Sequence, residues 1–192
     1  MEDCLWMKKT GWDKKIKEYI KDGGMVFGIC GGYQLLGVRI RDPYGVESDK
    51  KEVKGLGLLS IETILSREKV VREVKGRCLI NNRKIKGYEI HMGESRPIRD
   101  RGMPYLKLFF KGQSWKDGWI SEDKKIMGTY VHGIMDSAGF REDFLNRIRK
   151  KKGLKPKRAR RISSFRSKEY DRLASYFERH CNTKEIIKWV MT

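Results

Sequence analysis

The chain has 192 residues, enough for one domain with an appendage and for a sizeable hydrophobic core. Lysine and arginine number 44 against 25 aspartates and glutamates, and the net charge of +19 makes nucleic acid a partner to consider. No apolar run approaches the roughly 20 residues of a membrane span, and the charged N-terminus lacks a signal-peptide pattern, so we expect a cytoplasmic protein with no membrane partner.

The four cysteines are scattered along the chain and have neither paired nor metal-ligand spacing. This argues for a reducing compartment and against a disulfide framework or a structural zinc site, so we predict no metal. The cysteines are Cys4, Cys30, Cys78 and Cys181.

The first predicted elements are a helix and a buried strand; we assign no element to residues 1–11. Apolar residues at helical spacing predict a helix over Trp12–Ile20, which Gly23 and Gly24 close, and the apolar run Met25–Ile29 predicts the strand. In folds built from such units, another strand normally precedes the helix. Either the sheet has an unusual edge, or the chain is cut short at its N-terminus.

Cys30 follows this strand at a predicted sharp turn. Gly31 and Gly32 come next, and an apolar segment with helical potential begins at Tyr33. In such a strand, turn and helix, the turn residue is strained and pushed out of the sheet, and small neighbours let backbone come close. Cys30 is therefore a candidate nucleophile. The alternative is a small buried hydrophobe, as most free cysteines are.

The middle of the chain predicts surface loops and a series of short strands. The polar segments 39–54 and 94–102 predict the loops. The last three strands follow one another without helices between them, which indicates an antiparallel layer added to a parallel one. The predicted strands cover 55–63, 70–74, 78–80, 85–92, 106–110, 118–120 and 126–133, with a turn at Asp123 and Lys124 before the last.

The C-terminal part predicts three helices and one basic block. Apolar side chains share one face over 140–148, and two further amphipathic segments cover 170–177 and 186–190. The block 150–161 carries the densest charge, and because no nucleic-acid motif accompanies it, we interpret it as a solvated linker. We accordingly divide the chain into a domain (1–150), a basic linker (151–168) and C-terminal helices that pack on the domain (169–192).

Histidine is the side chain best suited to activate a cysteine near neutral pH, and the chain has three. His180 lies in a basic helical tail and is interpreted as a surface residue. His91 and His132 each end a predicted strand near a glycine, and strand ends are where the sites of α/β sheets form. Either could face Cys30, although a lone histidine is more often structural.

Four motifs resemble, in content and order, the glutamine amidotransferase domain of cobyric acid synthases. The resemblance extends from about residue 5 to about residue 180, and 170–174 is similar to the C-terminal helix of that family. Cobyrinate a,c-diamide synthases and a peptidoglycan-precursor amidotransferase share the cysteine elbow but differ around 33–34 and 88–93, respectively. The motifs are GICGGYQLLG (28–37), GLGLL (55–59), GYEIHMG (87–93) and GTYVHGI (128–134).

The resemblance implies an α/β fold of the class I glutamine amidotransferase type, a flavodoxin-like mixed sheet with flanking helices, here lacking the first strand or strands. It implies that Cys30 attacks the side-chain amide of glutamine and forms a thioester, with release of ammonia. His132 would take the thiol proton and give it to the leaving ammonia. The Gly31 amide would supply one oxyanion-hole donor. The residues implied to bind glutamine are Gly31, Gln34, Tyr88 and His91.

The group that orients His132 is left open by the resemblance. In the wider class a glutamate stands two residues after the histidine, but this position is Ile134 here, as the cobyric acid synthase subfamily leads one to expect. We hypothesise that Asp136 or Glu89 takes over part of that role.

A longer enzyme is also implied. The family has an ATP-binding synthetase domain, followed by the first strands of the amidotransferase domain with a second oxyanion donor, before the position of Trp6. ATP, magnesium and a corrinoid acceptor would bind in that absent domain, and this chain would hold no cofactor. A complementary N-terminal polypeptide is an expected partner. The ammonia would serve ATP-dependent amidation of corrinoid carboxylates in cobalamin biosynthesis.

The alternative from a different class is a catalytically incomplete, basic interaction or nucleic-acid-binding module that retains an amidotransferase-like fold. Such a module has no need of Cys30, His132 and the glycine motifs together. We therefore expect a glutaminase and do not expect nucleic acid to be its partner.

Overall fold

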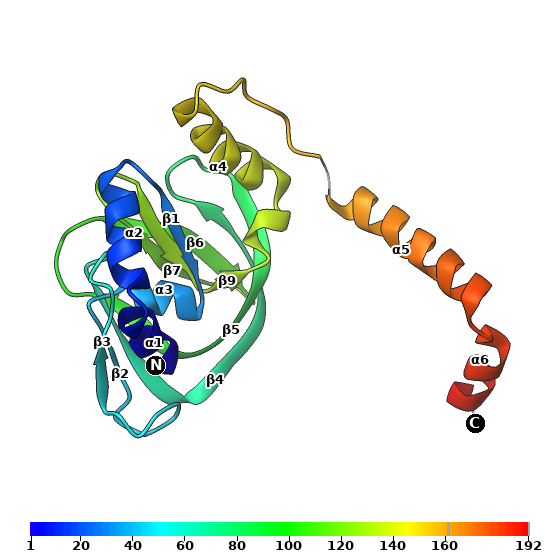
Figure 1. Cartoon of the computed structure of the whole chain (residues 1–192), viewed down its shortest axis with the longest axis horizontal. Coiled ribbons are helices and arrows are strands. Elements are labelled where there is room, and N and C mark those ends of the chain that lie inside the picture. The colour runs from blue at the N-terminus through cyan, green and yellow to red at the C-terminus, as the bar shows by residue number, and fades with distance from the viewer. Residues whose placement is uncertain (161, 192) are drawn as a thin grey trace. The chain divides into compact units, whose positions relative to one another are not determined.

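The computed structural model describes residues 1–160 and 162–191, which fall into two compact units (Figure 1). The first unit, Met1–Phe140, contains the whole sheet, and the second starts at Arg141. Arg161, the last residue of the basic block, and Thr192 lie outside the described residues. No helix of the described ranges is long and apolar enough to cross a membrane.

The N-terminal part of the chain folds into three short helices and one strand. They are α1 (Glu2–Lys9), α2 (Trp12–Lys21) and α3 (Gly31–Leu36), and β1 (Val26–Ile29) lies between α2 and α3. Met7 of α1 and Ile16 of α2 pack against a buried cluster that contains Tyr33 and Leu36 of α3. The predicted helix and strand are confirmed, and α1 occupies most of residues 1–11, to which we assigned no element. The buried residue of α1 is Cys4.

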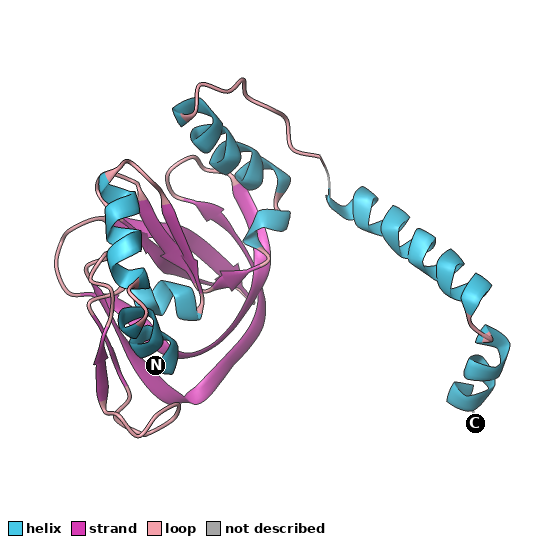
Figure 2. Ribbon diagram, in the orientation of Figure 1, coloured by secondary structure: helices cyan, strands magenta, loops and turns pink. Residues whose placement is uncertain are grey.

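The remaining strands join β1 in one mixed sheet (Figure 2). In chain order they are β2 (Arg39–Arg41), β3 (Glu52–Lys54), β4 (Ile61–Cys78), β5 (Lys84–Pro97), β6 (Met103–Phe110), β7 (Gln113–Ile120), β8 (Ile126–Thr129) and β9 (Val131–His132). The order is β1-β8-β7-β6-β4-β2-β3, and β5 pairs with both β4 and β9. The pairs β1/β8 and β2/β4 are parallel, whereas β6, β7 and β8 pair antiparallel. The predicted mixed α/β sheet and its antiparallel layer are therefore confirmed.

Two predicted loops are partly strand, which corrects the sequence-based assignment. Residues 39–54 contain β2 and β3, whose central residues Ile40 and Val53 are buried between charged neighbours. One apolar residue in three is too weak a pattern to distinguish a short strand from a loop. In the second case β5 continues to Pro97, because its pairing with β4 resumes after a register shift.

The predicted strands 70–74 and 78–80 are not separate either. Residues 70–78 belong to the single long strand β4, which starts at Ile61, and the register shift lies between Ile64 and Lys69. This irregularity interrupts the alternation of apolar and polar residues from which strands are predicted. One consequence concerns His91, which lies inside β5 rather than at its end.

The C-terminal helices are α4 (Ala138–Lys151), α5 (Ile162–His180) and α6 (Thr183–Met191), and a short 3-10 helix, η1 (Ile134–Asp136), precedes α4. All three predicted helices are confirmed. However, α5 begins at Ile162, within the segment predicted as linker. That α5 and α6 pack on the domain stays a prediction.

Candidate active site

Cys30 forms a strained turn between β1 and α3. Its backbone has φ 54° and ψ −118°, a conformation that non-glycine residues rarely adopt. The Cys30 amide donates to Thr129 O of β8 over 2.9 Å, and Cys30 O accepts from the Tyr33 and Gln34 amides in the first turn of α3. The turn is therefore bound to the sheet on one side and to the helix on the other, as in a nucleophile elbow.

Cys30 and Gln34 contact two backbone carbonyls of β5 that lie two residues apart. The Cys30 thiol donates to Ile90 O over 3.3 Å, and the Gln34 amide nitrogen donates to Met92 O over 3.2 Å. The same nitrogen of Gln34 also donates a buried hydrogen bond to the Tyr130 hydroxyl over 3.3 Å. Gln34 thus holds α3 against β5, and its role in binding glutamine stays a prediction.

His132 lies on β9, which also contacts β5. The parallel pairing of β1 with β8 places Ile29 beside Thr129, so that the residues after both strands emerge at one edge of the sheet. From there β9 pairs antiparallel with β5, and His132 lies opposite Tyr88. The two rings are stacked, with centroids 5.2 Å apart and planes 7° from parallel.

Cys30 and His132 are thereby brought to the same short stretch of β5. Cys30 contacts Ile90 and His132 pairs with Tyr88, two residues earlier, a separation of about 7 Å along a strand. Tyr88 is 44% exposed and Ile90 39% exposed, so this face of β5 is open. Beside Cys30, a Cβ built on Gly31 would have no described atom within 4 Å other than those of its neighbours in the chain and of the α3 backbone. The elbow therefore has room for a small substrate.

Burial governs the electrostatics of the thiol. Desolvation raises the pKa of Cys30, the Gly31 amide opposes this shift by hydrogen bonding, and the charge of Glu47 adds to it. A thiol in this environment is mostly protonated at neutral pH, so its use as a nucleophile requires a base.

His91 lies on the opposite face of β5 from Tyr88 and Ile90, because successive side chains of a strand alternate. Its imidazole stacks on Tyr130, with centroids 3.9 Å apart, and Nδ1 lies 2.9 Å from Gly93 O. Burial lowers the pKa of His91. The structure therefore separates the side chain of His91 from Cys30, and a glutamine-binding role for His91 stays a prediction.

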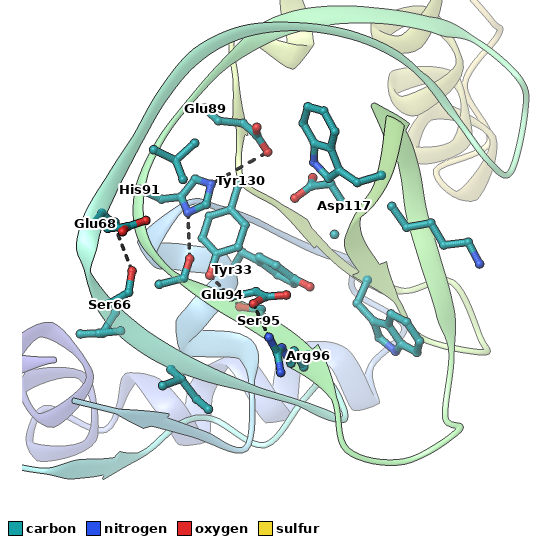
Figure 3. Close-up of a pocket in the computed structure, with 18 of the residues that line it drawn as sticks. Tyr33, Ser66, Glu68, Glu89, His91, Glu94, Ser95, Arg96, Asp117 and Tyr130 are labelled. Carbon is teal, nitrogen blue, oxygen red and sulfur yellow. Dashed lines mark hydrogen bonds and ion pairs between the residues drawn. The ribbon is translucent and has the colours of Figure 1, made fainter. Parts of the chain in front are cut away.

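The face of β5 that carries Glu89 and His91, which we call the inner face, lines a cavity of about 950 Å³ (Figure 3). Glu89, which is 1% exposed, accepts from Arg72 Nε over 2.6 Å and has Oε1 3.9 Å from His91 Nε2. Asp117 also faces the cavity and accepts from the Thr129 hydroxyl. Burial raises the pKa of Asp117 to about 7.

The sequence motifs did not lead us to this network. Arg72 and Asp117 lie in stretches where charged residues are common, and nothing in their spacing distinguishes them from surface residues. Their partners come from strands that are distant in sequence. Within the described ranges, no group of three or more His, Cys, Asp or Glu side chains could hold a metal ion.

Comparison with known proteins adds the family. Residues 1–140 match the CobB/CobQ-like glutamine amidotransferase domain. The cobyric acid synthase of Clostridium botulinum (strain Langeland) is 43% identical over 192 residues, covering 97% of this chain and 38% of that protein. The cobyric acid synthase of Chlorobium phaeobacteroides (strain BS1) is 40% identical over 187 residues, covering 96% of this chain and 37% of that protein. The chain thus spans little more than a third of the length of these relatives.

A solved structure supports the fold. A chain in the structure of PurLQS from Thermotoga maritima superposes with a TM-score of 0.52 at 17% identity, covering 71% of this chain and 68% of that one. The likeness is structural and carries no functional detail. The match over residues 1–140 shows that the chain belongs to the family of CobB/CobQ-like glutamine amidotransferase domains.

Proposed function

We propose that this chain hydrolyses glutamine through a thioester on Cys30 and releases ammonia. The observation that carries the proposal is the strained elbow: a cysteine at φ 54° whose thiol meets β5 two residues from the partner of His132. Strain at a non-glycine residue persists where the surrounding structure imposes it, which is common at reactive sites.

The chemistry divides between three groups. His132 takes the proton of the Cys30 thiol, and the thiolate attacks the amide carbon of the glutamine side chain. The Gly31 amide, which follows the nucleophile, stabilises the oxyanion. His132 gives its proton to the leaving ammonia, and water then hydrolyses the thioester to glutamate and restores the thiol.

Substrate recognition uses the open face of β5. Gly31 leaves space beside the thiol for the glutamine amide, and Tyr88 borders the same open face, where its ring stacks on His132. Gln34 and His91 contribute without touching this face. Gln34 fixes α3 on β5, and His91 stacks on Tyr130 at the inner face.

The ammonia serves an amidation carried out by the rest of a longer enzyme. The relatives are named cobyric acid synthase, and this chain spans 38% of the first of them. Amidation of corrinoid carboxylates with ATP and magnesium is therefore assigned to the part that this chain does not span.

Glutamate release measures the proposal directly. The chain is assayed alone and with the remaining part of the Clostridium botulinum relative, for the unmodified protein, Cys30→Ser, and Cys181→Ser as an exposed control. Release that Cys30→Ser abolishes and Cys181→Ser leaves intact is expected. Full release by Cys30→Ser, or no Cys30-dependent release under either condition, contradicts the proposal.

A further inference from the structure

His132 has no acidic partner at its buried nitrogen. Its Nε2 is buried and has no hydrogen-bond partner among the described residues. Glu89, one of the two carboxylates that we considered for orienting it, is bound by Arg72 on the inner face of β5. The residue two positions after the histidine, Ile134, is fully buried and apolar. The contact that the structure shows on this imidazole ring is a stacked aromatic side chain.

Tyr88 makes that contact. Its ring lies parallel to the imidazole, 5.2 Å away between centroids, and strand pairing aligns the two residues directly. A tyrosine face carries partial negative charge, so it attracts an imidazolium more strongly than a neutral imidazole. Tyr88 therefore suits a histidine that becomes charged when it takes a thiol proton.

Gly87 makes the close approach of β9 possible. A Cβ at this position would lie 2.2 Å from His132 O and 2.6 Å from Val131 Cγ1. Both separations are far shorter than van der Waals contact, and the first involves backbone that cannot rotate away. Any side chain here would push β9, and His132 with it, off β5.

We propose that Tyr88 and Gly87 are positioning residues for His132, with the tyrosine ring taking the part that a carboxylate plays elsewhere in the wider class. This rests on the glutaminase function proposed above. Tyr88 sets the plane of the imidazole, and Gly87 sets its distance from β5.

NMR of the imidazole protons tests the placement independently of activity. With three histidines in the chain, single histidine substitutions identify the His132 resonances. The ring current of Tyr88 is expected to move these resonances upfield, and Tyr88→Phe keeps that displacement. Tyr88→Leu and Gly87→Ala lose it, while the exposed tyrosine control Tyr19→Leu does not. Resonances unchanged in Tyr88→Leu overturn the proposal.

Glutaminase kinetics then separate positioning from substrate binding. Tyr88→Leu is expected to lower kcat by about tenfold to hundredfold, a part of what a general base contributes, and to leave KM within about twofold. Tyr88→Phe is expected to restore kcat. A rise in KM alone would make Tyr88 a substrate contact and overturn the positioning role. Should Cys30→Ser stay active, the glutaminase function fails, whereas the NMR result still decides whether Tyr88 holds His132.

Discussion

Gly28 lies where α3 crosses β1, and replacing it with alanine tests how closely the elbow is packed. A Cβ on Gly28 would lie 2.7 Å from Gly32 O, 2.8 Å from Gly32 C and 2.8 Å from Leu36 Cδ1. Ordinary contacts between such atoms begin near 3.5 Å, so α3 must move by about 0.8 Å. Cys30 is joined to the start of α3 and must move with it.

The expected cost follows from these contacts. Overpacking of a tight site costs about 1–3 kcal/mol, and loss of glycine flexibility in the unfolded chain returns about 0.4–1 kcal/mol. We expect Gly28→Ala to lower the free energy of unfolding by about 1.5 kcal/mol and Tm by about 3–6 °C. Scanning calorimetry gives Tm, and alkylation of Cys30 reports the displacement of the elbow.

Gly32→Ala is the matched control. A Cβ on Gly32 would meet no described atom within 4 Å beyond its chain neighbours and the α3 backbone, and alanine favours a helix over glycine by about 0.5–1 kcal/mol. We therefore expect Gly32→Ala to raise Tm slightly. A Tm for Gly28→Ala equal to or above that of Gly32→Ala would refute this account of the packing of α3 on β1.

Three further outcomes are expected. Glu89→Gln leaves the partly exposed Arg72 without its anion and should lower the free energy of unfolding in urea by about 2–3 kcal/mol; a loss under 0.5 kcal/mol would be inconsistent with a buried pair. Burial raises the pKa of Asp117 from 3.8 to about 7. Between these two pH values the folded chain keeps a proton that the unfolded chain has lost. The free energy of unfolding from this group therefore falls by about 4 kcal/mol as pH rises from about 4 to about 7. Asp117→Asn should remove this slope from urea titrations, and an unchanged slope would contradict the assignment. Because burial raises the pKa of Cys30, its iodoacetamide alkylation, followed by peptide mapping, should accelerate into the alkaline range; a rate already maximal at pH 7 would count against a protonated thiol.

Local patterns predict the elements that form the candidate site. Cys30 was identified because an apolar run, a cysteine and two glycines are adjacent in the chain, and β1, the turn and α3 follow that pattern. His132 was placed at a strand end, and it is the last residue of β9. Both placements depend on neighbours within a few residues.

Features that depend on distant strands were not predictable in this way. His91 has the same local pattern as His132, yet pairing with β4 extends β5 beyond it, and the alternation of side chains along β5 places His91 on the inner face. The stacking of Tyr88 on His132 likewise requires β9 to meet β5, and these two residues are 44 positions apart in the printed sequence. A register shift in β4 hid the length of that strand from the alternation of its residues.

The most direct test of the central claim, that Cys30 is the nucleophile of a glutaminase, is covalent labelling with a diazoketone analogue of glutamine, located by peptide mass spectrometry. The chain is labelled alone and with the remaining part of the Clostridium botulinum relative, with and without excess glutamine. We predict one adduct, on Cys30, which glutamine suppresses and His132→Ala slows. Labelling of Cys181 at an equal rate, or no glutamine-protected adduct on Cys30 under either condition, would contradict the account.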